Sequence, residues 1–245
     1  MQISAFQIAQ AVLVGILLVY LLYYVYTVLF DKKYQPKAWQ VAVKVGTVSR
    51  KLQKAEKNYP DKVRFFNFWF QIERLKNDGV YGSFAELGVY KGDSANLLHM
   101  MDTDRKFHLF DTFEGFTQTD LIGETGKAAT YTTKNFADTS FEKVKARLFS
   151  DKFEFHQGYF PDTTTGLEKE SFALVNMDAD LYNPTKAGLE FFYPRLSHGG
   201  LIIIHDYNPD WPGIMQAVDE FAKTINLPIV PMPDQDSSVM IFKNK

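Results

Sequence analysis

The stretch FALVNMDADLYNPT, residues 172–185, carries the pattern that decides the fold of this chain. Its first residues, 172–175, are apolar without alternation, which is typical of a strand buried on both faces of a sheet. Two carboxylates, Asp178 and Asp180, follow at the far end of that strand. Because an unpaired carboxylate is costly to bury, a core strand that ends in this way predicts a partner for its acids.

The same pattern returns in GGLIIIHDYNP, residues 199–209, where the apolar run Leu201–Ile204 ends in His205 and Asp206. The carboxyl ends of neighbouring parallel strands meet at one edge of a sheet, and ligands bind beyond that edge. Two core strands that deliver acids to the same edge therefore predict a functional site.

Strand and helix candidates alternate along residues 60–245. The predicted strands are Ser83–Gly88, Lys106–Asp111, Lys152–Gln157, Phe172–Asp178, Gly200–His205, Pro228–Val230 and Ser238–Phe242. The predicted helices lie within residues 61–79 and over Asp93–Met101, Phe141–Phe149, Thr185–Leu196 and Gly213–Ile225. This alternation predicts an α/β fold, a Rossmann-like sheet of mostly parallel strands with helices on both faces.

The composition narrows the classes of function. The chain has 245 residues, 46% of them hydrophobic, which is enough for a sizeable core. It has no cysteine, which excludes a disulfide scaffold, a thiolate zinc site and a cysteine nucleophile. Residues 31–58 carry a net charge of +6 and the rest of the chain a net −8. A mildly acidic domain of this kind is not typical of a nucleic-acid binder.

The N-terminal segment is apolar on all sides. Residues 5–30 contain no charged side chain, and a helix over these 26 residues is about 39 Å long, longer than the ~30 Å core of a bilayer. Tyrosines gather toward its C-terminal end, where aromatic rings favour the membrane interface. A buried core helix would be shorter and striped, and a cleaved signal peptide would have a basic start and a small-residue cleavage site. We therefore predict a single membrane-spanning helix.

The flanks of this helix predict its orientation. No lysine or arginine precedes it and several follow, which places the C-terminal part in the cytoplasm. The basic segment 31–59 is either a solvated linker helix or a helix that lies on anionic lipid. The predicted parts are thus an anchor over residues 1–30, a juxtamembrane segment over 31–59 and a globular domain over 60–245.

The loop after the first predicted strand, in FAELGVYKGDSANLL (84–98), holds two glycines, Gly88 and Gly92. Glycine lets the backbone approach a ligand closely, although an ordinary strand–turn–helix connection also uses it. The spacing is not the G-x-G-x-x-G of pyrophosphate binding, and Glu86 beside the loop would repel a phosphate. A cationic cofactor without phosphate fits better, and S-adenosylmethionine has an ammonium and a sulfonium.

The second predicted strand ends at Asp111, 23 residues after Gly88, where an acid can accept hydrogen bonds from ribose hydroxyls. The third ends in Gln157, Gly158 and Tyr159, which are placed to hold an adenine. The predicted cofactor-binding residues are Glu86, Gly88, Tyr90, Gly92, Ser94, Asp111, Thr112, Gln157, Gly158, Tyr159 and Asp178.

Oxygen and imidazole ligands without thiolates favour a hard divalent cation such as Mg²⁺. We predict Asp178, His205 and Asp206 as its ligands. A bound cation lowers the pKa of a substrate hydroxyl, and Asp178 or His205 could then take the proton as general base. Asp180 is either a further ligand, the N-cap of the next helix or a residue that supports the ligands from behind, and His205 alternatively makes only a strand-end hydrogen bond.

Four motifs together carry a family resemblance. ELGVYKGDSA, FDTFEGF, GYFPDT and the pair MDADLYNPT and LEFFYPRLSHGGLIIIHDY resemble the macrocin O-methyltransferase (TylF-type) family, from about Phe65 to Phe242. These are class I S-adenosylmethionine-dependent enzymes that methylate sugar hydroxyls of macrolides and related glycosides. The resemblance implies a seven-stranded sheet whose last strand is antiparallel. It implies that Glu86, Gly88 and Asp111 hold the cofactor, and that Asp178 and Asp206 bind Mg²⁺.

Two features depart from the family pattern. Members usually have two aspartates before the tyrosine of the DY motif, and His205 replaces the first, which makes the metal site weaker or different. The apolar helix over residues 5–30 is also not part of the pattern. The polar segment 117–140 is expected to be a lid over the acceptor, with a flexible insertion as the alternative.

The sequence therefore predicts a membrane-anchored O-methyltransferase that faces the cytoplasm and acts on a small-molecule or lipid-linked sugar. One alternative is a catechol-type, metal-dependent methyltransferase that acts on a phenol. Another is a catalytically inactive domain that serves as a membrane scaffold. A homo-oligomer is compatible with each of these.

Overall fold

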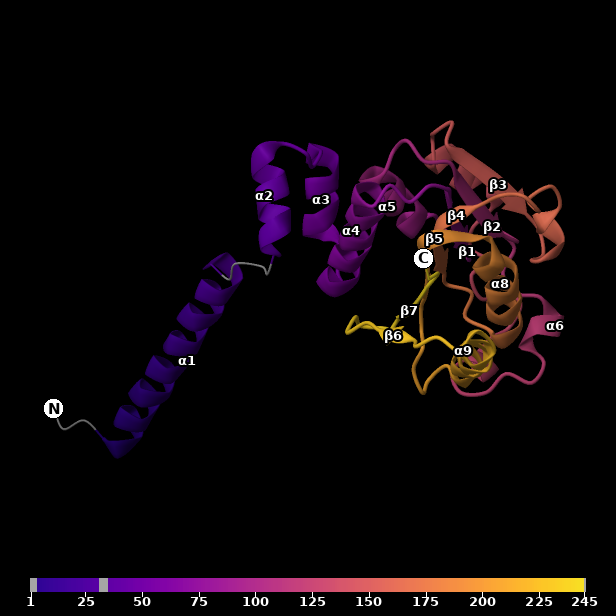
Figure 1. Cartoon of the computed structure of the whole chain (residues 1–245). Coiled ribbons are helices and arrows are strands. Elements are labelled where there is room, and N and C mark those ends of the chain that lie inside the picture. The colour runs from indigo at the N-terminus through magenta and orange to yellow at the C-terminus, as the bar shows by residue number, and fades with distance from the viewer. Residues whose placement is uncertain (1–3, 31–34, 245) are drawn as a thin grey trace. The chain divides into compact units, whose positions relative to one another are not determined.

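The computed structural model describes residues 4–30 and 35–244, so Lys32 and Lys33 of the predicted basic segment lie outside the described residues (Figure 1). The chain divides into two compact units, residues 1–45 and 46–245. The first unit contains helices α1 (Ala5–Phe30) and α2 (Lys37–Val45). Over Ala5–Thr27, α1 is long and apolar enough to cross a membrane, and none of it is buried. A signal sequence near an N-terminus meets the same criterion.

The second unit is built on a seven-stranded sheet with the order β3-β2-β1-β4-β5-β7-β6. Strands β1 to β5 are parallel, and β7 pairs antiparallel with both β5 and β6. The strands are β1 (Ser83–Leu87), β2 (Phe107–Asp111), β3 (Phe153–Gln157), β4 (Phe172–Met177), β5 (Leu196–Ile204), β6 (Val230–Pro231) and β7 (Val239–Phe242). The predicted mixed sheet with an antiparallel final strand is confirmed.

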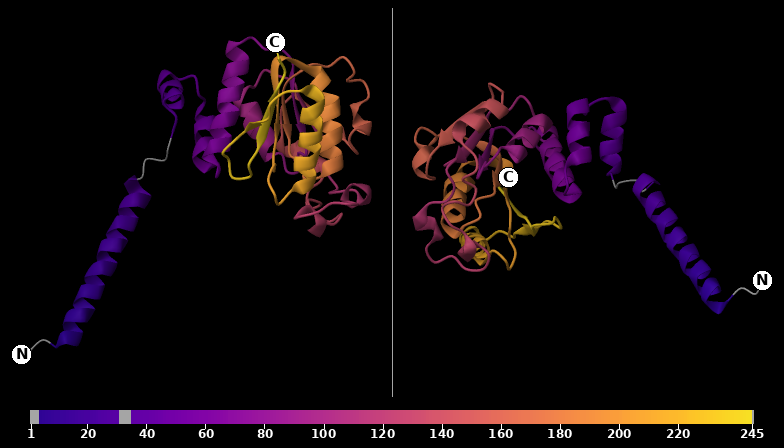
Figure 2. Two further views of the ribbon diagram at one scale, coloured as in Figure 1. Left: turned by 60° about the horizontal axis from the view of Figure 1, so that its bottom comes forward. Right: turned by 180° about the vertical axis from the view of Figure 1, so that it is seen from behind.

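Helices cover both faces of this sheet (Figure 2). The helices of the unit are α3 (Arg50–Asn58), α4 (Lys62–Asn77), α5 (Asp93–Met101), α6 (Gln118–Leu121), α7 (Phe141–Arg147), α8 (Tyr182–Arg195) and α9 (Pro212–Ile225), with 3-10 turns at Ala128–Thr130 and Asp162–Thr164. Helices α8 and α9 pack on the face that carries Leu87, Met177 and Ile204. Helices α4 and α5 lie against each other, and α4 packs on the opposite face, where the ring of Phe68 contacts that of His205.

The central strands are apolar because both of their faces are covered. Every residue of β1 and of β4 is buried, as expected for parallel strands between two helical layers. Helix α5 has its predicted bounds, and α4 begins after Asp61, whose carboxylate accepts from the backbone N–H of Arg64. Strand β5 begins at Leu196, earlier than predicted. Leu196 pairs with Phe172 of β4, and after an irregularity in the register the pairing continues with Leu201 opposite Leu174.

The register of the parallel strands aligns their carboxyl ends. Leu87 pairs with both Phe110 and Met177, and Met177 pairs with Ile204. The loops that follow these four strands therefore leave the sheet side by side. This placement brings together the residues predicted to bind the cofactor and those predicted to bind the metal.

Candidate active site

A cavity of 450 Å³ opens at this edge of the sheet, within the range of small-molecule sites. The loops after β1, β2, β3, β4 and β5 contribute to its wall. The loop after β2 is the long segment that leads to α7. Predicted site residues in the wall are Gly88, Tyr90, Ser94, Asp111, Thr112, Gly158, Tyr159, Asp178 and Asp206. Predicted residues outside the wall are Glu86, Gly92, Gln157 and His205.

Asp111 organises the loop after β1. Its Oδ2 accepts from the backbone N–H groups of Val89 and Tyr90 at 2.7 and 2.8 Å, and its Oδ1 accepts from that of Phe113 at 2.6 Å. Tyr90 and Phe113 have φ values of 50° and 57°, so both are held in the left-handed region. Oδ1 accepts only one hydrogen bond, so it keeps a further acceptor direction for a ligand hydroxyl.

Gly88 is required by the packing of two loops. Its φ is +87°, and a Cβ at this position would lie 2.0 Å from the backbone oxygen of Asp178. Gly92 has a φ of +78° at the start of α5, and a Cβ there would meet the side chain of Leu148. Both glycines thus have structural roles, and Gly88 alone of the two borders the cavity.

Glu86 lies in the core instead of the cavity wall. It is fully buried, and its Oε1 accepts from Asn176 Nδ2 at 2.8 Å. Its Oε2 has no hydrogen bond of good geometry, although Ser94 is near enough to ease its ionisation. Burial raises the pKa of Glu86 to about 8, so its side chain is mainly protonated at neutral pH. Gln157 is exposed at the end of β3, outside the wall.

Three aspartates of the cavity wall form a cluster. Oxygens of Asp178, Asp180 and Asp206 all lie within 4.8 Å of one another. Asp180 and Asp206 each have a φ of 60°, a strained conformation that turns both side chains out of the strand direction. Asp180 does not cap α8, because the N-cap position is Leu181 and the N–H of Tyr182 donates to Glu124.

The electrostatics of this cluster fit a divalent cation. Burial, followed by the charge of Asp178, raises the pKa of Asp206 to about 7. Burial and the charges of Asp178 and Asp206 raise the pKa of Asp180 well above its usual range. These shifts arise because negative charge is concentrated in a buried place, and an all-oxygen set of this size suits a hard cation.

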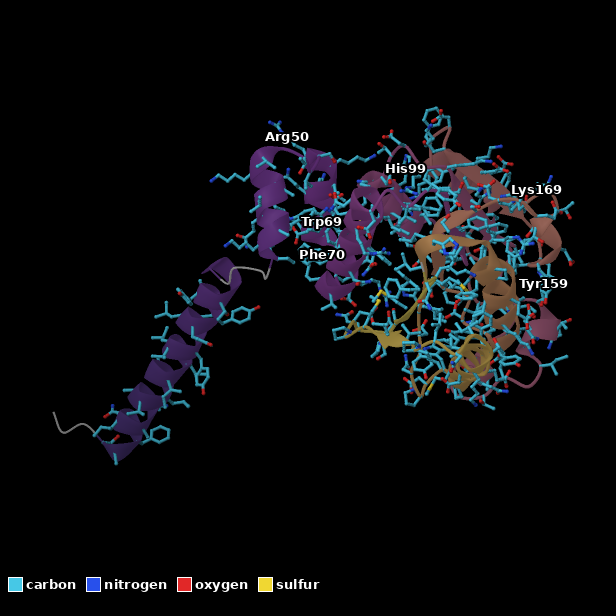
Figure 3. The ribbon with its side chains drawn as sticks, in the orientation of Figure 1. Arg50, Trp69, Phe70, His99, Tyr159 and Lys169 are labelled. Atoms are coloured by element: carbon cyan, nitrogen blue, oxygen red, sulfur yellow. The ribbon has the colours of Figure 1, made fainter. Side chains whose placement is uncertain are left out.

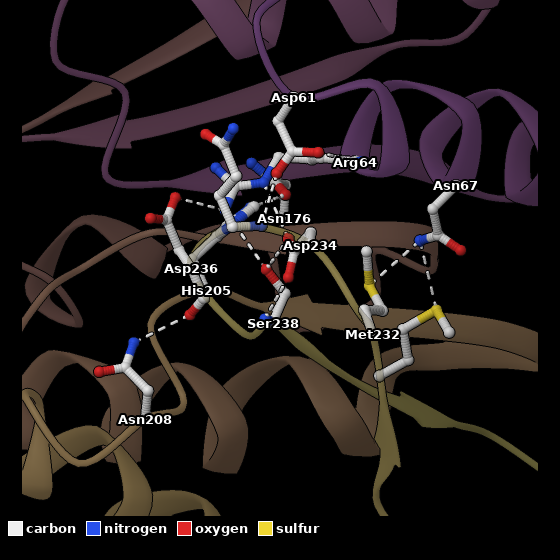
Figure 4. A network of polar contacts seen from close by, with 12 residues as sticks. Asp61, Arg64, Asn67, Asn176, His205, Asn208, Met232, Asp234, Asp236 and Ser238 are labelled. Atoms are coloured by element: carbon white, nitrogen blue, oxygen red, sulfur yellow. Dashed lines mark hydrogen bonds and ion pairs between the residues drawn. The ribbon is translucent and has the colours of Figure 1, made fainter. Parts of the chain in front are cut away.

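His205 does not belong to this cluster. Its Nε2 lies 2.8 Å from Asn176 Oδ1 and its Nδ1 lies 3.1 Å from Ser238 Oγ, so both ring nitrogens have protein partners (Figure 4). The ring is buried, and burial lowers its pKa. The predicted roles of metal ligand and general base do not agree with this placement. The strand-end hydrogen bond, left open by the sequence, describes His205 better.

The network continues from His205 into the β6–β7 hairpin (Figure 4). Ser238 Oγ donates to Asp234 Oδ2 at 2.6 Å, and Arg64 of α4 donates from Nε to the same oxygen at 3.0 Å. Arg64 Nη2 also donates to Asp236 Oδ2 at 2.6 Å, and Asp236 is part of the cavity wall. Arg64 thus holds a fourth carboxylate, that of Asp236, in the wall that contains the aspartate cluster. The sequence did not identify Arg64 or Asp236 as site residues.

The segment between β2 and α7 supplies an aromatic wall. Phe116 stacks on Tyr131 with ring centroids 5.3 Å apart, and Tyr131 meets Trp211 at 5.4 Å. Lys127 Nζ lies 5.1 Å from the centre of the Trp211 ring. All four residues line the cavity. The sequence predicted a lid over residues 117–140, but the polar composition of that segment did not single out Lys127 or Tyr131 as cavity residues.

Contacts with the core hold this segment in place. Glu124 Oε1 accepts from the backbone N–H of Tyr182 at 2.7 Å. The backbone N–H of Lys127 donates to the backbone oxygen of Asp210 at 2.8 Å. Asp120 is buried and accepts from the Tyr159 hydroxyl at 2.9 Å; Tyr159 is labelled in Figure 3. The segment therefore contacts the loop after β3, through Tyr159, and the loops around α8 and α9.

The sheet order, with β7 antiparallel next to β5 and a cavity beyond β1, β4 and β5, defines the class I methyltransferase fold. Solved structures with this fold resemble the chain. The O-methyltransferase NovP has a TM-score of 0.67 at 24% identity, covering 75% of this chain and 81% of its own. CalS11, a calicheamicin methyltransferase, has a TM-score of 0.57 at 20% identity over 99% and 94%.

The sequence matches the family described as Macrocin-O-methyltransferase (TylF) over residues 42–244, and the chain belongs to that family. The resemblance found in the sequence motifs is thereby confirmed.

Two curated relatives show how far the similarity extends. A tetracenomycin-C 4'-O-methyltransferase of Streptomyces olivaceus, whose named substrate bears a dimethoxy-rhamnosyl group, is 31% identical over 60% of this chain and 61% of its own length. The mycinamicin III 3''-O-methyltransferase of Micromonospora griseorubida is 33% identical over 64% and 67%. The chain thus spans about three fifths of the first of these relatives.

Proposed function

We propose that this protein is an S-adenosylmethionine-dependent O-methyltransferase that methylates a hydroxyl of a sugar or glycoside. The observation that carries the proposal is the single cavity wall that joins the glycine loop and Asp111 to the three clustered aspartates. Membership of the TylF family supports the reaction type.

The cofactor supplies an electrophilic methyl group bound to a sulfonium. The loop after β1, whose backbone N–H groups donate to Asp111, is the proposed place for its amino-acid and ribose parts, because Gly88, Tyr90 and Ser94 line the cavity there. Gly158 and Tyr159 border the same wall and are proposed to hold the adenine. Glu86 and Gln157 are not in contact with the cavity, so we assign Glu86 an indirect role through Asn176.

The acidic end of the cavity is proposed to receive the acceptor hydroxyl. Asp178, Asp180 and Asp206 would hold a divalent cation, which lowers the pKa of a bound hydroxyl and fixes its position. Asp178 is the proposed proton acceptor, because of the two residues predicted for that role it alone lies in the cavity wall. His205 takes no part in this set, since its ring nitrogens bind Asn176 and Ser238.

A sugar acceptor is supported by two observations. The side chains of Tyr131 and Trp211 line the same cavity as the acidic cluster, and aromatic rings are suited to contact the C–H groups of a pyranose ring. One curated relative and one solved structure, a TDP-rhamnose 3'-O-methyltransferase, are named for rhamnose-bearing substrates. That structure shares the fold with a TM-score of 0.51.

We further propose that α1 anchors the protein to a membrane and that the acceptor is linked to lipid. The support is the uncharged span Ala5–Thr27, none of which is buried. Tethering would raise the local concentration of such an acceptor. Membrane flotation of the full chain tests the anchor: a variant with Leu17→Arg and Leu21→Arg should move from the membrane to the soluble fraction, whereas unchanged flotation would contradict the anchor.

The function is tested with the full chain in non-ionic detergent. S-adenosylmethionine is titrated by calorimetry, and methyl transfer to rhamnosides and to a catechol is followed by mass spectrometry with and without Mg²⁺. We expect cofactor binding and methylation of the glycosides. Absence of cofactor binding would overturn the proposal, and methylation of the catechol alone would replace the sugar by a phenol.

A further inference from the structure

A second group of potential metal ligands lies away from the active-site cavity. His108 is on β2, and Glu154 and His156 are on the edge strand β3. His108 pairs with Glu154 in the register of these strands, and His156 is two residues further along, so the three side chains share one face of the sheet. None of the three lines the cavity.

The donor atoms of this group converge. One ligand atom from each residue lies within 4.8 Å of the others. His108 Nδ1 is 2.9 Å from His156 Nε2, and His156 Nε2 is 3.9 Å from Glu154 Oε1. Ligand atoms around a tetrahedral Zn²⁺ are about 3.3 Å apart when each is about 2.05 Å from the metal. The two observed separations lie on either side of that value, within reach of small side-chain rotations.

The protonation states suit a metal. Burial lowers the pKa of His108, and burial followed by the neighbouring His108 lowers that of His156 to about 4. These directions favour the neutral imidazoles that metal coordination requires. Partial burial opposes ionisation of Glu154, but the hydrogen bond from Lys106 and the neighbouring histidine keep the pKa of this carboxyl below its usual range.

The surroundings of His108 add an independent observation. The ring is fully buried, and its Nε2 has no hydrogen-bond partner of good geometry, yet it lies 3.5 Å from Glu170 Oε1. A carboxylate behind the second ring nitrogen is the usual way in which proteins orient a metal-binding histidine. Such a carboxylate favours the tautomer with the proton on Nε2, and Nδ1 of His108 lies 2.9 Å from His156 Nε2. Access from solvent is through Glu154, whose side chain is 41% exposed.

We propose that His108, Glu154 and His156 form a second cation site, which takes Zn²⁺ or a similar transition-metal ion with water as its fourth ligand. Two imidazoles and one carboxylate suit such an ion better than Mg²⁺. The ion would fasten the edge strand β3 to β2. Because Gly158 and Tyr159 follow β3 directly and line the cavity, it would stabilise the adjoining wall of the active site.

The test uses the metal-free full chain in non-ionic detergent with millimolar Mg²⁺, which competes for the aspartate cluster. Zn²⁺ is titrated by calorimetry into the wild type, His156→Gln, Glu154→Gln and the control His198→Gln. His198 is an exposed histidine whose Nδ1 lies 2.7 Å from the Asn244 backbone oxygen. Co²⁺ is added in parallel, because four-coordinate Co²⁺ absorbs visible light much more strongly than octahedral Co²⁺.

We expect one more Zn²⁺ per chain in the wild type and the control than in His156→Gln. For Glu154→Gln, whose exposed side chain carries little folding risk, we expect at least tenfold weaker binding. Zn²⁺ at 100 times its Kd should raise the melting temperature of the wild type by about 5–10 °C. Equal Zn²⁺ stoichiometry and affinity in all four proteins, or a purely octahedral Co²⁺ spectrum, would overturn the proposal.

Discussion

Replacing Glu86 with glutamine is expected to stabilise the fold increasingly as the pH rises. Glu86 is fully buried and its pKa is raised to about 8, mainly by burial. Its one good hydrogen bond, from Asn176 Nδ2 to Oε1, can be accepted equally by a glutamine oxygen. Glutamine has nearly the shape of the protonated glutamic acid and never ionises.

The sign and size of this pH-dependent change in the free energy of unfolding follow from proton linkage. Below pH 4.5, Glu86 is protonated in both the folded and the unfolded chain, so it contributes no pH dependence. Between pH 4.5 and 8 the unfolded chain loses this proton while the folded chain keeps it, so the free energy of unfolding of the wild type falls as the pH rises. At about 1.4 kcal/mol per pH unit, the loss is on the order of 4 kcal/mol between pH 5 and pH 8. Above pH 8 it levels off.

Urea unfolding of the full chain in detergent, followed by tryptophan fluorescence at pH 5, 6, 7 and 8, measures this effect. The stability of Glu86→Gln relative to the wild type should grow steadily across the series. Glu190→Gln, an identical change at an exposed position of α8, is the control and should show no such trend. A difference between Glu86→Gln and the wild type that does not vary with pH would refute the reasoning.

Three further predictions concern the loops of the site. Gly88→Ala should cost more than about 4 kcal/mol of stability in urea unfolding, because its Cβ meets the Asp178 oxygen, whereas Gly123→Ala, with a φ of +85° and open space around it, should cost only about 1–2 kcal/mol; equal costs would contradict the steric argument. Asp206→Asn should weaken Mg²⁺ binding by more than about tenfold in calorimetry, and His205→Gln should leave it nearly unchanged; the reverse order would restore His205 as a ligand. Because the pKa of Asp206 is about 7, Mg²⁺ affinity should rise from pH 6 to pH 8 as the competing proton leaves, and a flat profile would argue against this carboxylate as a ligand.

The arrangement of strands and helices could be predicted from the sequence because it depends on local patterns. Apolar runs without alternation indicate strands covered on both faces, and the residues that follow them must lie at the carboxyl edge of the sheet. The places of Asp111, Asp178 and Asp206 in the cavity wall follow from this rule. The uncharged N-terminal helix could be recognised in the same way, from composition alone.

The tertiary structure decided which of these edge residues turn toward the cavity. Glu86, Asn176 and His205 share the sheet face covered by α4, so their side chains bind one another in the core. Asp180 and Asp206, which follow β4 and β5, each have a φ of 60°, so strand alternation does not set the direction of their side chains. Strand period and chain order do not specify such conformations, since they depend on packing between loops.

Residues distant in sequence complete the site. Lys127 and Tyr131 reach Trp211 only because Glu124 and Lys127 fix their segment to the loops around α8 and α9. The sequence by itself thus determined the sheet, its functional edge and the acids delivered there. The tertiary structure alone decided which side chains meet in the cavity, because contacts across the fold, and not local pattern, set the direction of each side chain.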